Sequence, residues 1–485
     1  MTKREGILDL SGKTTGIVPN KKFWISLVIS LAIYFAFALI DPLNAYGELT
    51  SKATGFIIGS VFFMCTSSVP LSIIAMLVAT LGTMIGFYDW STVSARLGSS
   101  SFYQAFGMMV VAMGCEFTPF GKRLGYWILR RFGNKPTRLI LVLSITTALL
   151  SSFLANAACI ILMSSIVNSM LLAMGEQPGK SKHGKVLMLV VVMATMVGGA
   201  GLMCGSPIGI ASCLSYMDSA LGGSYSPTFL QWAAVCFPTL LICIVPMTMV
   251  YIVYFKVKND EFELLPKSYY DEQLAALGPM GGSEYRWLII LFGMVLALLL
   301  GMSTAYAAIL FAAISLFPCI GVADSKKVLK KIPWNPLIAI CMLPLMSTIV
   351  SGTGIDVWLS DVLTPVIGGV SPLGFMLICS AAMSILMTVL VNSMQAAMAL
   401  VMTVAAPICV SMGYNPTIVL LPAAMGASYM WVLGANQYVM MNKEYGWWEM
   451  QDTIVPGIIS IIIPTVVSCF VAYLLGPMFG MPIYL

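Results

Sequence analysis

Charge is scarce in this sequence. Only 9% of its 485 residues are Asp, Glu, Lys or Arg, while 59% are hydrophobic. Because a soluble globular domain needs about a quarter of its residues charged, most of the exterior of this chain must face something other than water. Apolar runs long enough to cross a bilayer recur along the whole length, which predicts an all-α integral membrane protein.

Histidine and paired cysteines are also missing. His183 is the only histidine, and none of the 12 cysteines forms a Cys-x-x-Cys pair. The sequence therefore offers no metal site of the usual Cys/His kind, and we interpret the cysteines as buried free thiols. We do not expect an enzyme either, since no nucleophile stands beside a base at membrane depth.

The apolar runs fall into single crossings and two longer stretches. Stretches 138–174 and 372–412 are nearly twice as long as one crossing requires, and each holds a polar island, at 154–157 and 390–393. We therefore interpret each as a re-entrant helical hairpin that turns back within the membrane. The eleven predicted crossings are 23–40, 54–66, 70–86, 103–118, 187–215, 227–255, 286–302, 304–322, 334–352, 417–440 and 453–478.

Basic residues decide the predicted orientation in the cell (inner) membrane. The first 22 residues carry five Lys or Arg and are assigned to the cytoplasm, as is a polar linker at 256–285. With this start the two hairpins enter from opposite faces, which is typical of an inverted repeat. The predicted parts are a cytoplasmic segment 1–22, a first half 23–225 with hairpin 138–174, and a second half 226–485 with hairpin 372–412.

One long apolar segment after each hairpin is interrupted. Segment 187–215 is broken by glycines and Ser206, and segment 417–440 by a run from Gly434 to Gln437. Paired interruptions at matching positions indicate a transport site between the two halves. A single glycine of this kind would equally serve close helix packing.

The predicted spans contain almost no ionisable side chain. Glu116 lies at a membrane edge near Lys122 and Arg123, and we interpret it as an interfacial residue. Proton-driven carriers usually keep an acid or a histidine in the membrane, so a proton relay has no obvious place here. Unwound backbone offers carbonyl oxygens to Na⁺, and helix N-termini offer N–H groups to an anion. Because the two charges compensate each other in a low dielectric, the pattern favours Na⁺-coupled uptake of an anion.

Other functions stay open on these residues alone. An anion exchanger on the same fold would use the same groups, because the hairpins do not reveal the coupling mode. A carrier of neutral solutes or a channel also fits neutral polar groups. Uptake that requires Na⁺ would select the symporter, uptake that requires internal substrate the exchanger, and single-channel currents the channel.

Four stretches resemble the divalent anion:sodium symporter family of the ion-transporter superfamily. They are residues 117–156, the run from Gly198 to Pro207, Leu277-Gly278-Pro279-Met280 with Glu284, and residues 334–354 followed by Asn392. The resemblance covers nearly the full chain and rests on order and spacing. It implies an elevator-type homodimer that carries a di- or tricarboxylate or sulfate with Na⁺, built from about 11 transmembrane helices and two opposed hairpins.

The resemblance also implies site residues. The family has Ser-Asn-Thr at both hairpin tips, and Asn156 and Asn392 match its asparagines. The implied substrate contacts are Asn156, Ala157, Ser206, Pro207, Asn392, Ser393, Asn436 and Gln437. The implied Na⁺ ligands are Ser151, Asn156 and Gly205 at one site, and Thr388, Asn392 and Ala435 at the other. At the second site Met387 stands where the family has Thr, with Thr388 adjacent.

Both tips depart from the family signature. Ala155 and Ala157 flank the first asparagine and Val391 precedes the second, so only Ser393 keeps a hydroxyl. Each lost hydroxyl removes a hydrogen bond worth about 1 kcal/mol. The predicted substrate is therefore an anion with its charged end near Asn392 and a less polar end at the first tip, such as a monocarboxylate, a sulfonate or a modified organic acid.

Overall fold

The computed structural model describes residues 21–67, 69–132, 135–221, 225–257, 265–318, 320–367, 369–390, 394–432 and 437–485, and only the backbone of residues 132, 360, 363–367 and 437. Within these ranges the chain is helical and forms no β-strand. The first twelve helices are α1 (Lys21–Ile40), α2 (Thr50–Thr66), α3 (Leu71–Ile85), α4 (Trp90–Leu97), α5 (Ser100–Met113), α6 (Phe120–Phe132), α7 (Pro136–Phe153), α8 (Asn156–Ala173), α9 (Lys182–Gly201), α10 (Pro207–Leu221), α11 (Phe229–Tyr254) and α12 (Lys267–Ala276).

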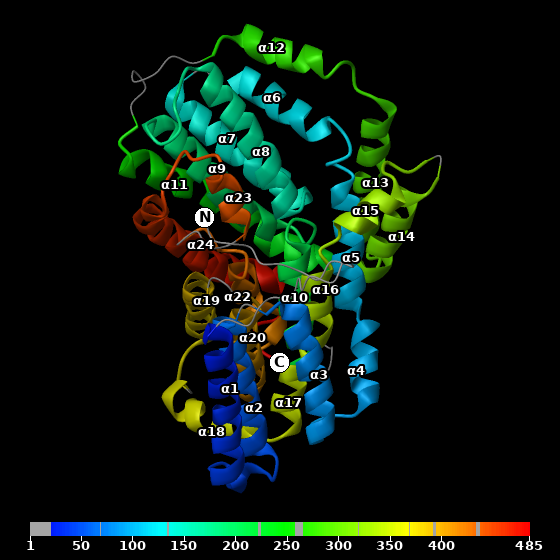
Figure 1. Ribbon diagram of the computed structural model, residues 1–485, viewed down its shortest axis with the longest axis vertical. Helices are drawn as coiled ribbons and strands as arrows, with labels where there is room; N and C mark the ends of the chain where they lie inside the picture. Colours follow the sequence, from blue (N-terminus) through cyan, green and yellow to red (C-terminus); the bar gives the residue numbers. More distant parts are fainter. Residues whose placement is uncertain are drawn as a thin grey trace.

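The second half of the chain continues in the same way. Its helices are α13 (Gly282–Leu299), α14 (Thr304–Leu316), α15 (Ser325–Lys331), α16 (Trp334–Met342), α17 (Leu345–Gly352), α18 (Ile355–Ile367), α19 (Pro372–Val389), α20 (Met394–Ser411), α21 (Pro416–Val419), α22 (Leu421–Gly426), α23 (Gln437–Lys443) and α24 (Ile454–Leu475). In Figure 1, α1, α2, α3 and α5 run up and down, α6 and α12 cross the top, and α18 lies at the bottom.

Ten helices in the described ranges are long and apolar enough to cross a membrane. This confirms the predicted all-α, multi-pass membrane protein. The apolar helices differ in burial: 6% of the apolar window of α1 is buried, against 94% in α9. Because α1 is apolar and exposed, its surface suits lipid, whereas α9 forms the centre of the protein.

Each predicted hairpin is a pair of helices joined by a short connection. The first pair, α7 and α8, meets at Leu154 and Ala155, and the second pair is α19 and α20. Both pairs match the predicted stretches to within two residues. Whether each pair re-enters the membrane or crosses it stays a prediction.

The hairpins pack against the broken helices that follow them. Helix α7 lies on α9 and α11, and α19 lies in the same way on α22 and α24. Helices α11 and α24 also pack on each other, so the two groups meet along their long helices. The groups cross over as well, because α8 contacts α23 and α10 contacts α20.

Several predicted crossings have different limits in the structure. Segment 187–215 is two helices, α9 and α10, separated at residues 202–206, and segment 334–352 is bent at Pro344, between α16 and α17. Segment 417–440 consists of the short helices α21, α22 and α23 instead of one interrupted span. The linker 256–285 contains α12, which the sequence did not predict, and its last residues begin α13.

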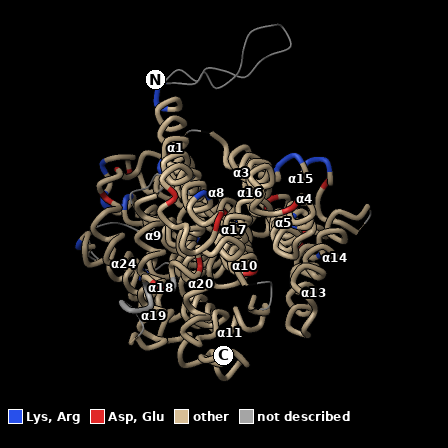
Figure 2. The backbone as a smooth tube through the Cα atoms, turned by 90° about the horizontal axis from the view of Figure 1, so that it is seen from below, with Lys and Arg blue, Asp and Glu red and all other residues tan. Residues whose placement is uncertain are grey.

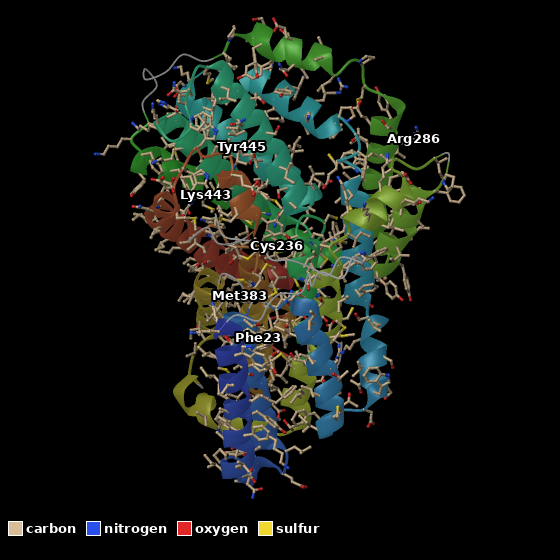
Figure 3. The ribbon with its side chains drawn as sticks, viewed as in Figure 1. Phe23, Cys236, Arg286, Met383, Lys443 and Tyr445 are labelled. Carbon is tan, nitrogen blue, oxygen red and sulfur yellow. The ribbon has the colours of Figure 1, made fainter. Side chains whose placement is uncertain are left out.

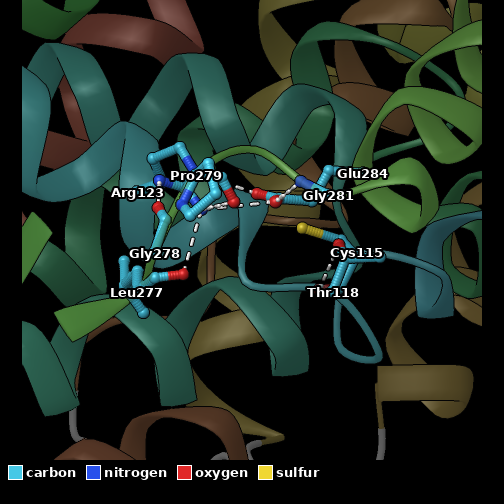
Figure 4. A network of polar contacts seen from close by, with 8 residues as sticks. All are labelled: Cys115, Thr118, Arg123, Leu277, Gly278, Pro279, Gly281 and Glu284. Carbon is cyan, nitrogen blue, oxygen red and sulfur yellow. Dashed lines mark hydrogen bonds and ion pairs between the residues drawn. The ribbon is translucent and has the colours of Figure 1, made fainter. Parts of the chain in front are cut away.

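A partly buried arginine joins two of the stretches that carry the family resemblance (Figure 4). Arg123 of α6 donates to the Glu284 carboxylate of α13 at 3.0 and 3.3 Å. Its other N–H groups reach the carbonyls of Leu277, Gly278 and Pro279. Arg123 thus pairs with Glu284 and not with Glu116 of the preceding turn, whose partner is described below.

Candidate functional site

The first hairpin tip places an asparagine at the start of a helix. Helix α7 ends at Phe153, and α8 begins at Asn156 after two extended residues. The Asn156 side chain is buried, and Ser151, five residues earlier in the last turns of α7, is fully buried beside it. The tip is thus held by its own polar side chains.

The side-chain amide of Asn156 ends in an oxygen and a nitrogen, and one of these two atoms faces a group of oxygen atoms. With nitrogen at that position, Asn156 donates to Ser151 Oγ at 3.0 Å and to the carbonyls of Thr195 and Gly205 at 3.3 Å. Ser151 Oγ donates in turn to the Thr195 carbonyl at 2.8 Å. With oxygen at that position, four oxygens face one another, an arrangement that a cation stabilises. We call Ser151 Oγ, the Asn156 amide and the Thr195 and Gly205 carbonyls the oxygen cluster.

Glycines let the tip approach the broken helix this closely. A Cβ on Gly199 would lie 2.1 Å from the Asn156 amide oxygen, and one on Gly205 would lie 2.3 Å from the Ser151 carbonyl. A Cβ on Gly198 would lie 2.3 Å from the Ala148 carbonyl. The glycine-rich run therefore serves close packing and, through the same contacts, forms the oxygen cluster.

A cavity of about 370 Å³ lies beside the oxygen cluster. The residues that line it are Met109, Met113, Glu116, Ala155, Asn156, Ala157, Ile161, Gly205, Ser206, Pro207, Ile208, Gly209, Lys331, Pro333, Met394, Met430, Tyr438 and Met441. The predicted contacts Asn156, Ala157, Ser206 and Pro207 are all among them. The volume is within the range of small-ligand sites.

Two helices begin at the wall of this cavity. They are α8 at Asn156 and α10 at Pro207, with 18 and 15 residues. The first N–H groups of a helix have no partner within it, and the helix dipole makes that end partly positive. The cavity thus collects two positive helix ends, which favours a bound anion.

Most of the second hairpin tip lies outside the described residues. Asn392, Ser393, Ala435 and Asn436 lie outside the described residues, and Gln437 is described only as the first backbone position of α23. Thr388 is half-buried and donates to the Ser384 carbonyl of its own helix at 2.8 Å. The second Na⁺ site and the contacts of this tip stay predictions.

The segment after the second break is fastened to the first hairpin. Asn442 of α23 is fully buried, donates to Ser164 Oγ of α8 at 2.6 Å, and accepts from Trp448 Nε1 at 2.7 Å. Figure 3 shows Lys443 and Tyr445, at the end of this segment, among the side chains around α8 and α9. Elements of the two predicted halves therefore share one buried polar network.

Sequence reasoning missed three residues of the site. Thr195 contributes a backbone carbonyl, which leaves no signal in the side-chain pattern. Glu116 was placed at a membrane edge and Lys331 was not connected with it, yet both line the cavity and their charged groups lie 2.9 Å apart. Their distance of 215 positions in the chain explains why no local motif joined them.

Comparison with known proteins identifies the family. The pattern of the citrate transporter family matches residues 56–425, which is most of the chain. The chain belongs to this family. The resemblance to the divalent anion:sodium symporters is thereby confirmed, and citrate transporter family proteins are membrane transporters and not enzymes.

Two staphylococcal relatives agree with this assignment. A protein of Staphylococcus saprophyticus named sodium-dependent dicarboxylate transporter is 25% identical over 402 residues, 76% of this chain and 75% of that protein. Its Staphylococcus aureus counterpart is 23% identical over 398 residues, 76% of this chain and 74% of that protein. A crystal structure of the Alcanivorax borkumensis YdaH transporter is matched at 11% identity and a TM-score of 0.49, over 80% of this chain and 87% of that one.

Proposed function

We propose that this protein is a secondary active transporter that moves an organic anion across the cell membrane together with Na⁺. The observation that carries the proposal is a single cavity at which α8 and α10 begin, with the oxygen cluster in its wall. Helix N-termini attract an anion, while carbonyls and hydroxyls at a broken helix suit Na⁺. The names of the family and of the relatives support the same class of substrate and ion.

The Asn156 amide offers a route by which the two ligands depend on each other. With Na⁺ in the oxygen cluster, its oxygen faces the ion and its NH₂ group is directed away from the cluster. Without Na⁺, its nitrogen bonds the cluster oxygens instead and the carbonyl oxygen is directed away from them. Because Asn156 also lines the cavity at the start of α8, an ion that fixes this tip favours a bound anion, and an anion in turn favours Na⁺ by the same free energy.

The proposed ligands follow the sequence predictions. The first Na⁺ is proposed at Ser151, Asn156 and Gly205, and the Thr195 carbonyl, which faces the same amide, is proposed as a further ligand. A second Na⁺ is proposed at Thr388, Asn392 and Ala435. The proposed substrate contacts are Asn156, Ala157, Ser206, Pro207, Asn392, Ser393, Asn436 and Gln437.

Carboxylates are the leading substrate class. The family and the staphylococcal relatives are named for citrate and dicarboxylates, whereas Ala155 and Ala157 leave the first tip without hydroxyls. A carboxylate anchored at helix starts, with a less polar portion against these alanines, satisfies both observations. Sulfate and sulfonates are alternatives that the uptake assay below separates, and a labelled monocarboxylate supplied in the same assay tests the third alternative, monocarboxylates.

The proposal includes the arrangement of the whole chain. The halves 23–225 and 226–485 are inverted, the N-terminus is cytoplasmic, and the hairpins move with the broken helices in an elevator-type homodimer. Helix α7 packs on α9 and α11 as α19 packs on α22 and α24, which supports two related groups of helices. Helix α11 belongs to the first group by this packing, although it begins after the proposed boundary at 225.

Uptake into proteoliposomes tests the function. Purified protein is reconstituted and supplied with labelled succinate, citrate, a sulfonate or sulfate, under an inward Na⁺ gradient or with choline in place of Na⁺. We expect accumulation of an organic anion that ceases with choline. A thermal-shift screen of the same anions, with and without Na⁺, reports binding independently, since a ligand of the native state stabilises it.

Two results would contradict the proposal. Accumulation that continues in choline but requires the anion inside the liposomes would identify an exchanger. Failure of every anion to be taken up or to raise the melting temperature would remove anion transport altogether.

A further inference from the structure

The cavity wall contains one ion pair. Of its described lining residues, Glu116 and Lys331 are the charged ones. Lys331 Nζ lies 2.9 Å from Glu116 Oε2, so the two charges cancel at this wall. Neither was among the residues expected to contact the substrate.

The ammonium group is held by consecutive residues of one turn. Glu116 supplies the carboxylate, and the ring of Phe117 lies with its centroid 4.9 Å from Lys331 Nζ. Both residues follow the end of α5, while Lys331 is the last residue of α15. Because the aromatic ring attracts a cation independently of the carboxylate, the ammonium keeps one partner beside the cavity when the Glu116 contact opens.

The pair is poorly suited to a purely stabilising role. The Lys331 side chain is 54% exposed and that of Glu116 29% exposed. Ion pairs of this exposure contribute little to folding stability because water screens them. An anion that enters the cavity can therefore replace Glu116 as the partner of Lys331 at little cost to the fold.

A dianion bound in this cavity would require a cation such as Lys331. Ala155 and Ala157 provide no hydroxyl at the first tip, and the Asn156 amide is engaged by the oxygen cluster. A dianion seated with one carboxylate at the helix starts leaves its second carboxylate without a counter-charge. An anion buried without such a partner loses hydration that nothing replaces.

We propose that Lys331 binds the second carboxylate of a dianionic organic acid, and that Glu116 forms an ion pair with Lys331 when the cavity is empty. This inference rests on the proposed anion transport. It makes Lys331 a specificity-determining residue that favours dicarboxylates over monocarboxylates. Glu116 competes with the substrate for Lys331. Removing the charge of Lys331 therefore lowers substrate affinity, whereas removing the charge of Glu116 raises it.

Helix α15 provides a matched control. Its lysines gather at one edge of the molecule (Figure 2), and Lys330, adjacent to Lys331, is also exposed but does not line the cavity. Lys330→Gln removes the same charge from the same short helix. Any general effect of lower local charge on anion approach will therefore appear in both variants.

The test measures KM and Vmax for Na⁺-driven succinate uptake in proteoliposomes, with gluconate as a monocarboxylate competitor. For Lys331→Gln we expect KM to rise about tenfold, the loss of one charge-assisted contact, with Vmax changed less than about twofold. Glu116→Gln is expected to lower KM about threefold, and Lys331→Arg to stay close to the parent. Inhibition by gluconate should change little in Lys331→Gln, and Lys330→Gln should match the parent.

Several outcomes would overturn the inference. An unchanged KM in Lys331→Gln excludes contact with the substrate, and an equal rise in KM in Lys331→Gln and Glu116→Gln indicates a structural pair. Equal effects in Lys330→Gln and Lys331→Gln indicate general attraction instead of a site. If the parent protein takes up and binds none of succinate, malate and citrate but transports another anion, the inference fails while the proposed function stands. If it transports no anion, both fail.

Discussion

Arg123 donates two hydrogen bonds, at 3.0 and 3.3 Å, to the carboxylate of Glu284, 161 positions later in the chain. The Glu284 side chain is 1% exposed and that of Arg123 is 18% exposed. The same carboxylate also accepts from the Gly281 N–H at 2.8 Å, which caps the start of α13. One ion pair thus joins α6, the end of the polar linker and the following helix.

Removing this arginine should destabilise the protein. Arg123→Ala leaves the Glu284 carboxylate buried without its cation, a change that costs about 3–5 kcal/mol at buried pairs. We expect a clearly lower melting temperature in detergent and reduced protein in the membrane.

Arg130 of the same helix is the control for this prediction. It pairs with Asp271 of α12 at 2.6 Å, but both side chains are more than two-fifths exposed. Such surface pairs contribute about 0–1 kcal/mol, so Arg130→Ala should melt near the parent temperature. Equal losses in the two variants would mean that burial of the pair is not the deciding factor.

The oxygen cluster predicts how two substitutions at the first tip differ. Asn156→Ala should abolish transport while the protein still inserts, because it removes a group shared by ion and substrate. Ser151→Ala removes one oxygen and should raise the Na⁺ concentration for half-maximal uptake about tenfold, equivalent to about 1.4 kcal/mol.

Both variants are measured by Na⁺ titration of uptake and by protein content of the liposomes. Transport retained by Asn156→Ala would remove the first tip from the site. An unchanged Na⁺ requirement in Ser151→Ala would place the ion elsewhere.

Two neighbouring glycines should separate ion binding from packing. A methyl group on Gly199 meets the Asn156 amide, whereas one on Gly198 meets backbone atoms of Ala148. Gly199→Ala should therefore weaken Na⁺-dependent uptake more than stability, and Gly198→Ala should mainly lower the melting temperature.

Gly352→Ala serves as the control, because a Cβ there meets no atom within 4 Å. It should leave uptake and melting close to the parent. If Gly199→Ala transports normally with an unchanged Na⁺ requirement, the close approach of the tip is not needed for the cluster.

The network at Asn442 predicts a graded loss of stability. Asn442→Ala leaves the buried Ser164 hydroxyl and the Trp448 indole without this partner, and each such group costs about 1–3 kcal/mol. Ser164→Ala removes one of these bonds and leaves Asn442 bonded to Trp448. The melting temperature in detergent should fall most in Asn442→Ala and less in Ser164→Ala, and the reverse order would contradict the network.

Much of the architecture followed from local patterns in the sequence. The polar islands within stretches 138–174 and 372–412 marked hairpin turns, and the helix pairs span Pro136–Ala173 and Pro372–Ser411. The glycine run after Gly198 likewise marked the break between α9 and α10. Such features are readable because a turn or a helix break depends on a few adjacent residues and on the length a membrane crossing requires.

Other features depended on distant parts of the chain. The Thr195 carbonyl joins Asn156 only because α9 packs against α7, and a backbone carbonyl leaves no mark in a sequence. The pairs of Lys331 with Glu116 and of Arg123 with Glu284 link residues more than 150 positions apart. Sequence alone determined that this protein is a helical membrane protein with two hairpins and broken helices. Tertiary packing decided which oxygens, charges and helix ends share one cavity, because that depends on how the helices lie against one another.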